Sequence, residues 1–308
     1  MLSGNDIINS EIGILQLVAD KYMADQKLRI GRIPYANLFP IFYILANECD
    51  CSGYEFVEGV PSALNYMLRI GEVDISPSSS IEYMRHSDEY AIVEDHSISS
   101  MGSVGSIILL SGKPIEELNG RPVFTSSQSE TSVALLRIIF ERFYKVKCDL
   151  KTADIHLDSL LSAAEAYLLI GDDALKAKKI LMSNPPIPPL VKGGEGGFLK
   201  TELTYIYDLG ELWHKHTGLP FTYALWIYKK DCCKEKTELM RRFKSDLNKA
   251  KKLALENFKI IAPESPLKGI LTENELIAYW ENISYDFGDE HKKGFELFRK
   301  FSEELGLI

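Results

Sequence analysis

The sequence is short of several features that mark large classes of protein. Basic residues are in the minority, because 35 Lys and Arg stand against 44 Asp and Glu, for a formal net charge of −9. Nucleic acids and anionic membranes reward clustered positive charge, so the composition argues against both as partners. No apolar run reaches the ~18 to 20 residues that a membrane span needs. We therefore expect no nucleic-acid partner and no membrane partner.

Cysteine is scarce, and its spacing matches neither a disulfide framework nor a C-x-x-C metal knuckle. Free thiols in a reducing compartment are the simplest interpretation. Residues 1–27 have no basic segment ahead of an apolar one, so they lack the layout of a secretory signal. We interpret them as an amphipathic helical extension and expect a cytoplasmic protein. The five cysteines are Cys49, Cys51, Cys148, Cys232 and Cys233.

Signatures of common enzyme classes are also missing. We find no G-x-S-x-G nucleophile elbow, no phosphate-binding loop with its lysine and no H-E-x-x-H metal motif. His214 and His216 make a poor metal pair, because side chains two residues apart point away from each other on a helix. We expect neither a metal ion nor a cofactor. If the chain is an enzyme, neutral hydrogen-bond donors carry its chemistry.

The sequence does contain a regular alternation of apolar strands and amphipathic helices. "FPIFYILANE" has a proline in its first turn, and "PSALNYMLRI" ends at Gly71, as helices commonly begin and end. Over 308 residues this rhythm predicts an α/β fold with mostly parallel sheets, in one large domain or two lobes. Residues 183–201 break the rhythm with four prolines and four glycines. We predict a flexible, exposed insertion there rather than a lid.

Four stretches place small polar residues or glycine between an apolar strand and the following helix. Ligands of open α/β sheets bind beyond the carboxyl ends of the strands, where helix N-termini offer unpaired N–H groups. The pattern therefore predicts a cleft that binds a small oxyacid. The stretches are "PYAN" (34–37), "SPSSS" (76–80), "SSQSETS" (126–132) and "GDD" (171–173).

Each stretch also has a purely structural interpretation. Serine, threonine and aspartate cap helices, so Ser79, Ser129 and Asp172 need have no ligand at all. Asn37 fits this interpretation least well, because the neighbouring aromatic rings of Tyr35 and Phe39 would suit a ring-shaped ligand. On the residues alone, both interpretations stay open.

The sequence resembles the bacterial chorismate dehydratases of the futalosine route to menaquinone, over nearly all of residues 28–303. The sister family, the 1,4-dihydroxy-6-naphthoate synthases, opens with a "SPCPND"-like turn where this chain has "IPYAN". The resemblance is carried by "GRIPYANLFPIFY", "GVPSALNYMLRIGEVDISPSSSIEY", "SISSMGSVGSIILLS", "SSQSETSVALLR", "YLLIGDDALKA", "YDLGELWHKHTGLPFTYALW" and "ISYDFGDEHKKG".

The resemblance implies a type 2 periplasmic-binding-protein-like fold, with two α/β lobes and the ligand between them. We place lobe one at residues 28–111 and 220–308, lobe two at 112–219, and the crossovers near 109–113 and 216–223. The implied reaction is dehydration of chorismate to 3-[(1-carboxyvinyl)oxy]benzoate, with this small molecule as the partner. The alternatives are a non-catalytic solute-binding protein of the same fold, which the missing export signal disfavours, and the sister naphthoate synthase.

The resemblance also implies roles for individual residues. Asn37 and Ser106 match the positions implicated in catalysis, and each would donate a hydrogen bond to a substrate oxygen. Hydroxyls and backbone N–H groups of the remaining stretches would bind the two carboxylates. The residues implied in substrate binding are Arg32, Tyr35, Ser78, Ser79, Gly105, Ser129, Thr131, Ser132 and Asp172.

Overall fold

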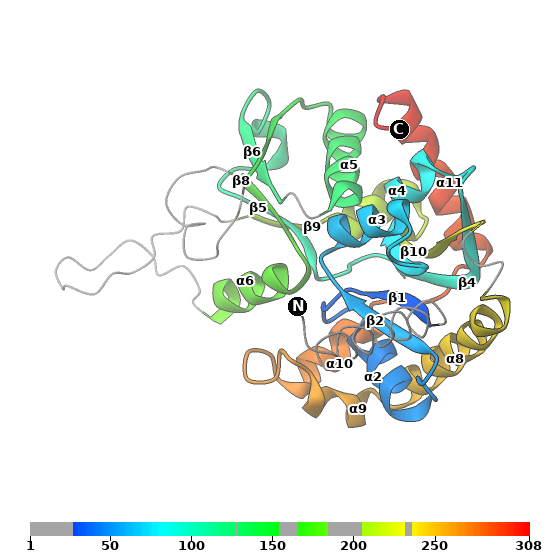
Figure 1. Cartoon of the computed structure of the whole chain (residues 1–308). Helices are drawn as coiled ribbons and strands as arrows, with labels where there is room; N and C mark the ends of the chain where they lie inside the picture. The colour runs from blue at the N-terminus through cyan, green and yellow to red at the C-terminus, as the bar shows by residue number, and fades with distance from the viewer. Residues whose placement is uncertain (1–26, 127–128, 154–165, 184–204, 232–235) are drawn as a thin grey trace, which may run out of the picture.

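The computed structural model describes residues 27–126, 129–153, 166–183, 205–231 and 236–308, which fold around two separate five-stranded sheets (Figure 1). The predictions for residues 1–26 and for nearly all of the 183–201 segment lie outside these ranges. So do Cys232 and Cys233, whereas the three described cysteines are free thiols.

The first sheet has the strand order β2-β1-β3-β10-β4. Strands β2 and β3 run parallel to β1, and β10 runs antiparallel to both β3 and β4. The sheet is therefore completed by a strand from late in the sequence. Its strands are β1 (Leu28–Arg32), β2 (Tyr54–Glu58), β3 (Ile75–Ser79), β4 (Tyr90–Ser100) and β10 (Phe221–Lys229).

Helices cover both faces of the first sheet. In Figure 1, α2, α8, α9 and α10 gather on one side and α3 and α4 on the other, while α11 packs against β10. Among the described helices, none is both long and apolar enough to cross a membrane. Their bounds are α2 (Phe39–Glu48), α3 (Pro61–Ile70), α4 (Ser80–Arg85), α8 (Thr237–Glu256), α9 (Phe258–Ile261), α10 (Glu273–Glu281) and α11 (Asp289–Glu304).

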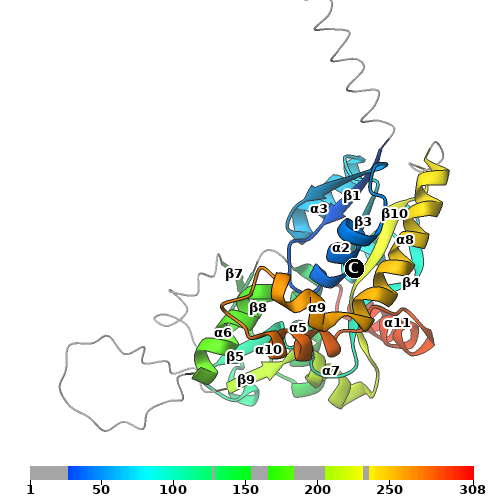
Figure 2. The ribbon, with the colours of Figure 1, turned by 90° about the horizontal axis from the view of Figure 1, so that it is seen from below.

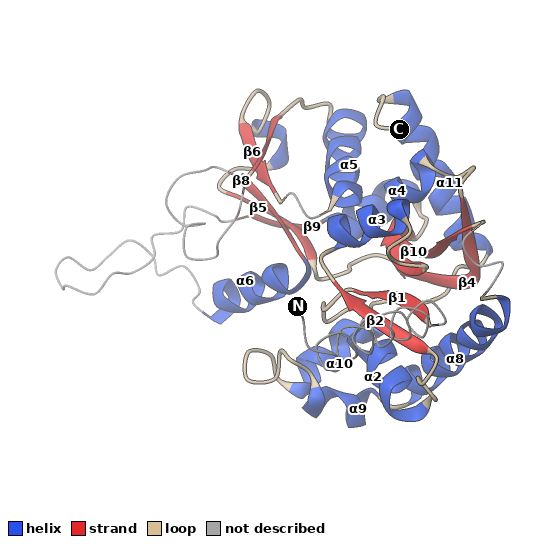
Figure 3. Ribbon diagram, in the orientation of Figure 1, coloured by secondary structure: helices blue, strands red, loops and turns tan. Residues whose placement is uncertain are grey.

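The second sheet has the order β7-β6-β8-β5-β9, and Figure 3 shows it set apart from the first. Its helices are α5 (Glu130–Ile138), which continues into a π-helical stretch (Ile139–Tyr144), α6 (Gly171–Ser183) and α7 (Leu209–Thr217). The strands are β5 (Ile107–Ser111), β6 (Pro122–Thr125), β7 (Asp149–Thr152), β8 (Ala166–Ile170) and β9 (Tyr205–Asp208).

Both sheets are mixed: four strands of each run in the same direction, in line with the expectation of mostly parallel sheets, and one strand runs against them. The antiparallel strands are β10 in the first sheet and β5 in the second. Each is the strand that the chain forms just after crossing from the other sheet. The chain enters each sheet from the side of the other sheet, so the first strand after a crossover runs antiparallel to its neighbours. This accounts for the mixed pattern.

The predicted position of the first crossover is wrong. We expected it near residues 109–113, with everything up to 111 in lobe one. Instead, Ile107–Ser111 is a buried strand that pairs with both β8 and β9 of the second sheet. The chain crosses earlier, over residues 101–106, where Gly102 and Gly105 adopt left-handed φ angles of 97° and 77°. We propose that the lobes divide there and at residues 218–220.

The serine-rich stretch after Ile75, which we placed between a strand and a helix, belongs to the strand itself up to Ser79. Strand β3 continues to Ser79 because β10 pairs with it along its whole length. All five residues of the strand are buried. Helix α4 begins at the next residue, with the Ser79 hydroxyl accepting from the backbone N–H of Glu82.

Gly210 allows α7 to pack closely against the first crossover and against Tyr223, which follows the second crossover. A Cβ at Gly210 would lie 2.4 Å from the carbonyl oxygen of Gly102 and 2.4 Å from the hydroxyl of Tyr223. Gly102 belongs to the first crossover, and Tyr223 follows the second. Figure 2, which looks from below, shows α7 to one side of β5 and β9, and the helix contacts both strands. A side chain at this position would push the connections away from the helix.

We expect Gly210→Ala to lower the free energy of unfolding by about 2 to 3 kcal/mol, despite the better helix propensity of alanine. The added methyl group would meet oxygens that cannot move without shifting a crossover. Urea denaturation followed by circular dichroism measures the change. Gly288→Ala is the control, because its Cβ would meet nothing closer than 4.0 Å, and its expected cost is about 1 kcal/mol or less. Equal costs for the two variants would contradict the packing argument.

Candidate active site

A small cavity lies where the two sheets approach each other. It has a volume of about 80 Å³ and is lined by both polar and apolar side chains. The apolar part includes Ile33, Ile98 and Ile170, which come from both sheets. The polar part consists of Tyr35, Asn37, Ser79, Ser106, Ser129, Ser132 and Tyr223.

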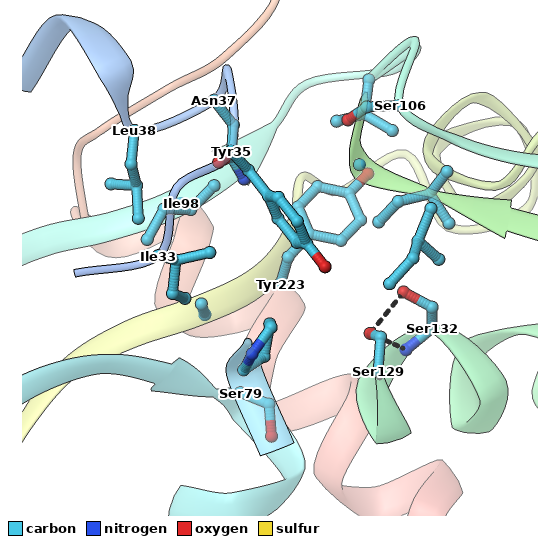
Figure 4. Close-up of a pocket in the computed structure, with 16 residues that line it drawn as sticks. Ile33, Tyr35, Asn37, Leu38, Ser79, Ile98, Ser106, Ser129, Ser132 and Tyr223 are labelled. Atoms are coloured by element: carbon cyan, nitrogen blue, oxygen red, sulfur yellow. Dashed lines mark hydrogen bonds between the residues drawn. The ribbon is translucent and has the colours of Figure 1, made fainter. Parts of the chain in front are cut away.

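Six of the predicted site residues meet at this cavity, although they come from separate parts of the chain. Figure 4 shows Asn37 and Ser106 on one side of the Tyr35 ring and the remaining three serines on the other. The strand-end stretches and the family resemblance thus point to residues that line one common cavity, and their roles stay predictions. The six residues are Tyr35, Asn37, Ser79, Ser106, Ser129 and Ser132.

The other predicted residues do not line the cavity. Arg32 forms an ion pair with Glu58 at 3.4 Å, and its guanidinium lies over the Phe42 ring. Ser78 is fully buried in β3, and its hydroxyl has no partner among the described residues. The remaining three, Gly105, Thr131 and Asp172, make hydrogen bonds that brace the walls of the cavity.

The turn that carries Asn37 is held by three hydrogen bonds from distant residues. The N–H of Ala36 donates to Oδ1 of Asp172 at 2.9 Å, and the indole N–H of Trp280 donates to the carbonyl of Ala36 at 2.8 Å. The hydroxyl of Tyr285 donates to the carbonyl of Asn37 at 2.6 Å. Oδ1 of Asn37, in contrast, is buried with no partner in the described chain. The backbone is fixed while the side-chain amide stays available to a ligand.

Ser106 is buried at the end of the first crossover, just before β5. Its hydroxyl oxygen accepts a hydrogen bond from the hydroxyl of Tyr279 at 2.9 Å. Its carbonyl accepts from the backbone N–H of Gly171 at 2.7 Å, at the start of α6. The residue is therefore held from both its backbone and its side chain.

The crossover before Ser106 is held by the buried carboxylate of Asp208. One oxygen accepts from Ser103 Oγ at 2.8 Å and from the N–H of Gly105 at 2.6 Å. The other accepts from the N–H groups of Val104, Gly210 and Glu211 at 2.9 to 3.1 Å. Asp208 thus caps α7 and fastens the crossover with the same side chain.

Direct contacts also join the two halves of the molecule across the cavity. The N–H of Ile81 donates to the hydroxyl of Thr131 at 3.2 Å, and Arg85 pairs with Glu130. These bonds and the Asp172 bond to the Asn37 turn hold the cavity closed. Its volume of about 80 Å³ is well below the ~300 to 1,000 Å³ of typical small-molecule sites. The cavity is therefore narrower in this arrangement than a typical ligand-binding site.

The cavity wall consists of neutral groups. Burial, reinforced by the carboxylates of Asp172 and Asp173, raises the pKa of Tyr35 to about 12. Burial likewise raises the pKa of Tyr223 well above its usual range. Both phenols therefore stay protonated near neutral pH, and none of the described lining residues carries a charge. Such a wall offers hydrogen-bond donors without ionised acids or bases.

Comparison with known proteins identifies the family. A family profile described as "Menaquinone biosynthesis" matches residues 28–304. The chain belongs to this menaquinone biosynthesis family. A curated relative from Thermus thermophilus, named chorismate dehydratase, is 28% identical over 284 residues, which cover 90% of this chain and 95% of the relative.

Solved structures confirm the predicted α/β fold of the periplasmic-binding-protein type. A protein of Archaeoglobus fulgidus gives a TM-score of 0.68 at 17% identity and covers 92% of this chain and 99% of its own. The periplasmic aliphatic sulphonate binding protein SsuA of Escherichia coli gives 0.60 at 13% identity, with 92% and 94% covered. At these identities the likeness establishes the fold alone.

Several residues that shape the site were not singled out from the sequence. Asp208 and Tyr223 lie in the motif "YDLGELWHKHTGLPFTYALW", and Tyr285 lies in "ISYDFGDEHKKG". These motifs carried the family resemblance, but nothing in their spacing assigned a role to these three residues. Trp280 and Tyr279 lie just before the second motif, without a local signal of their own.

We expect the stability of Asp172→Asn, relative to wild type, to rise with pH. Burial raises the pKa of the Asp172 carboxyl, although the bond from Ala36 opposes this. Since the folded-state pKa lies above the unfolded-state value, ionisation costs stability as pH climbs from about 4 and levels off above the raised pKa. The asparagine keeps an acceptor for the N–H of Ala36 and removes the buried charge.

Thermal unfolding at several pH values from about 4 to about 7 measures this difference. The matched control is Asp173→Asn, at the exposed neighbouring position, which we expect to change stability little at any pH. A constant difference between wild type and Asp172→Asn over this range would contradict the argument.

Proposed function

We propose that this chain is a chorismate dehydratase, a carbon–oxygen lyase that converts chorismate to 3-[(1-carboxyvinyl)oxy]benzoate and water in menaquinone biosynthesis. Support comes from family membership and from the relative named chorismate dehydratase, which matches over nearly the full length of both chains. The observation that carries the proposal is the cavity wall of neutral hydroxyl and amide groups around Asn37, which offers hydrogen-bond donors without an ionised acid or base.

The proposed reaction breaks the C4–O bond and the C3–H bond of the substrate, and the six-membered ring stays intact. The hydroxyl group at C4 leaves with its bonding electrons, and a proton is lost from C3, whose electron pair completes the aromatic ring. Aromatisation supplies the driving force, so the protein has to bind, orient and exclude water. The neutral wall offers no ionised base, and we propose that the enolpyruvyl carboxylate of the substrate takes the proton. The departing hydroxide and one proton then form water.

Asn37 and Ser106 are the proposed donors to the departing oxygen. Negative charge develops on this oxygen in the transition state, and fixed donors stabilise it without having to reorganise. The Asn37 turn is fixed by a bond that it donates to Asp172 and by bonds that it accepts from Trp280 and Tyr285. These bonds are the physical reason to assign Asn37 a catalytic rather than a structural role.

The three remaining serines of the cavity are the proposed carboxylate-binding groups. Ser129 is the N-cap of α5 and Ser132 lies in its first turn, where backbone N–H groups and the helix dipole favour an anion. Ser79 faces the cavity from the end of β3. Chorismate carries two carboxylates, and these hydroxyls lie on the other side of the Tyr35 ring from Asn37 (Figure 4).

A solute-binding protein without chemistry is the second candidate. It is favoured by the structural likeness to proteins such as the sulphonate-binding protein SsuA. Both candidates need a cleft that opens and closes, so the fold does not separate them. Incubation of the purified protein with chorismate does separate them, because only an enzyme forms 3-[(1-carboxyvinyl)oxy]benzoate. Liquid chromatography with mass spectrometry detects that product, and its absence would contradict the proposal.

We expect Asn37→Ala to reduce kcat on chorismate by on the order of a hundredfold or more, the scale of losing one oriented donor. Its circular dichroism spectrum and melting temperature should remain close to those of wild type, because the truncated amide oxygen has no described protein partner. Asn47→Ala, on the exposed side of α2, is the matched control and should keep wild-type kcat. Turnover by Asn37→Ala within a few-fold of wild type would return Asn37 to a structural role.

A further inference from the structure

Two of the cavity serines are each backed by a buried side chain that does not line the cavity itself. The hydroxyl of Tyr279, on α10, donates to Oγ of Ser106 at 2.9 Å. The amide nitrogen of Asn65, on α3, donates to Oγ of Ser79 at 3.3 Å. Tyr279 is 5% exposed and Asn65 is 6% exposed. Both are donors placed behind a hydroxyl that faces the ligand space.

A serine hydroxyl has one proton and two lone pairs, so a donor behind it decides where the proton goes. Ser106 uses a lone pair to accept from Tyr279, and the described residues include no acceptor for its own proton. Burial raises the pKa of Tyr279 well above its usual range, which keeps the phenol a donor at working pH. The remaining direction for the Ser106 proton is the cavity.

Ser79 is constrained more tightly. Its oxygen accepts from the Asn65 amide at 3.3 Å and from the backbone N–H of Glu82 at 3.2 Å. Both lone pairs are then engaged, so the hydroxyl presents only its proton to a ligand. The amide oxygen of Asn65 is buried without a partner among the described residues. The bond from its amide nitrogen to Ser79 is therefore the described side-chain hydrogen bond that orients this amide.

We propose that Tyr279 and Asn65 are positioning residues that fix the hydroxyls of Ser106 and Ser79 as hydrogen-bond donors toward the cavity. The inference rests on the proposed function, and it explains how serines, which can donate or accept, come to favour anionic oxygens of the substrate. Two groups on helices outside the cavity wall thereby set the polarity of the site.

Double-mutant cycles on chorismate turnover test the inference. We expect Tyr279→Phe, which keeps the ring against Gly105, to lower kcat/KM by about tenfold. If Tyr279 acts through Ser106, the same change in a Ser106→Ala background should alter kcat/KM by less than about twofold. In a Ser79→Ala background it should keep its full effect. Asn65→Leu should alter kcat/KM by less than about twofold in the Ser79→Ala background. In the Ser106→Ala background it should keep its full effect.

Tyr54→Phe is the matched control for loss of a buried phenol. Tyr54 donates to Asp246 at 2.7 Å, at the end of β2 away from the cavity, so kcat/KM should stay at the wild-type value. Equal losses from Tyr279→Phe with and without the Ser106 hydroxyl would overturn the positioning role and make Tyr279 a packing residue. Equal losses from Asn65→Leu with and without the Ser79 hydroxyl would likewise overturn the positioning role of Asn65.

Neutron diffraction of the perdeuterated, unliganded protein separates this inference from the proposed function. Absence of chorismate turnover in wild type would remove the function but leave the hydroxyl geometry open to direct observation. Deuterons of Ser106 and Ser79 directed into the cavity would support the inference. Deuterons directed at the oxygen of Tyr279 or of Asn65 would overturn it.

Discussion

The site depends first on the carboxylate of Asp208, which accepts five hydrogen bonds at the point where the chain leaves one sheet for the other. Three of its donors belong to the crossover and two to the start of α7. A buried carboxylate needs such partners, and a crossover without regular secondary structure needs an acceptor for its N–H groups. The two requirements satisfy each other. Ser106 follows this anchored segment directly, so the bonds of Asp208 to residues 103–105 fix the backbone position of Ser106 independently of its side chain.

Buried side chains also hold other site residues in place around the cavity. Trp280 and Tyr285 hold the backbone of the Asn37 turn, and Tyr279 holds the Ser106 hydroxyl. These three aromatic residues come from the last part of the chain, whereas the groups that they position come from its first part. The apolar body of each ring fills the core, and its polar atom supplies a directed hydrogen bond. Packing and site geometry are therefore set by the same side chains, which makes the geometry as rigid as the core.

Local sequence signals predicted individual elements well and their assembly less well. Helices α2 and α3 were predicted because each has a proline in its first turn and α3 ends at Gly71, and these signals are local to the helix. The directions of β5 and β10 were missed, because a strand's direction depends on which sheet it joins. Strand-end reasoning and the family resemblance located Asn37, Ser79 and Ser106 at one cavity, and their roles remain predictions. Arg32 does not line the cavity and pairs with Glu58 on the neighbouring strand, a contact that spacing along one strand does not reveal, so its role in substrate binding stays a prediction.

The position of β10 in the first sheet has a consequence for how the protein is made. The described part of β4 pairs in its sheet with β10 alone, and the two are separated by the entire second sheet in sequence. On a ribosome, residues 107–208 emerge as one uninterrupted unit, whereas β4 waits on the order of ten seconds for its partner strand. The middle of the chain therefore completes its sheet first, and the N-terminal strands wait for β10 to complete theirs. The Asn37 turn waits longest, because Tyr285, which donates to its carbonyl, is synthesised after every strand of both sheets.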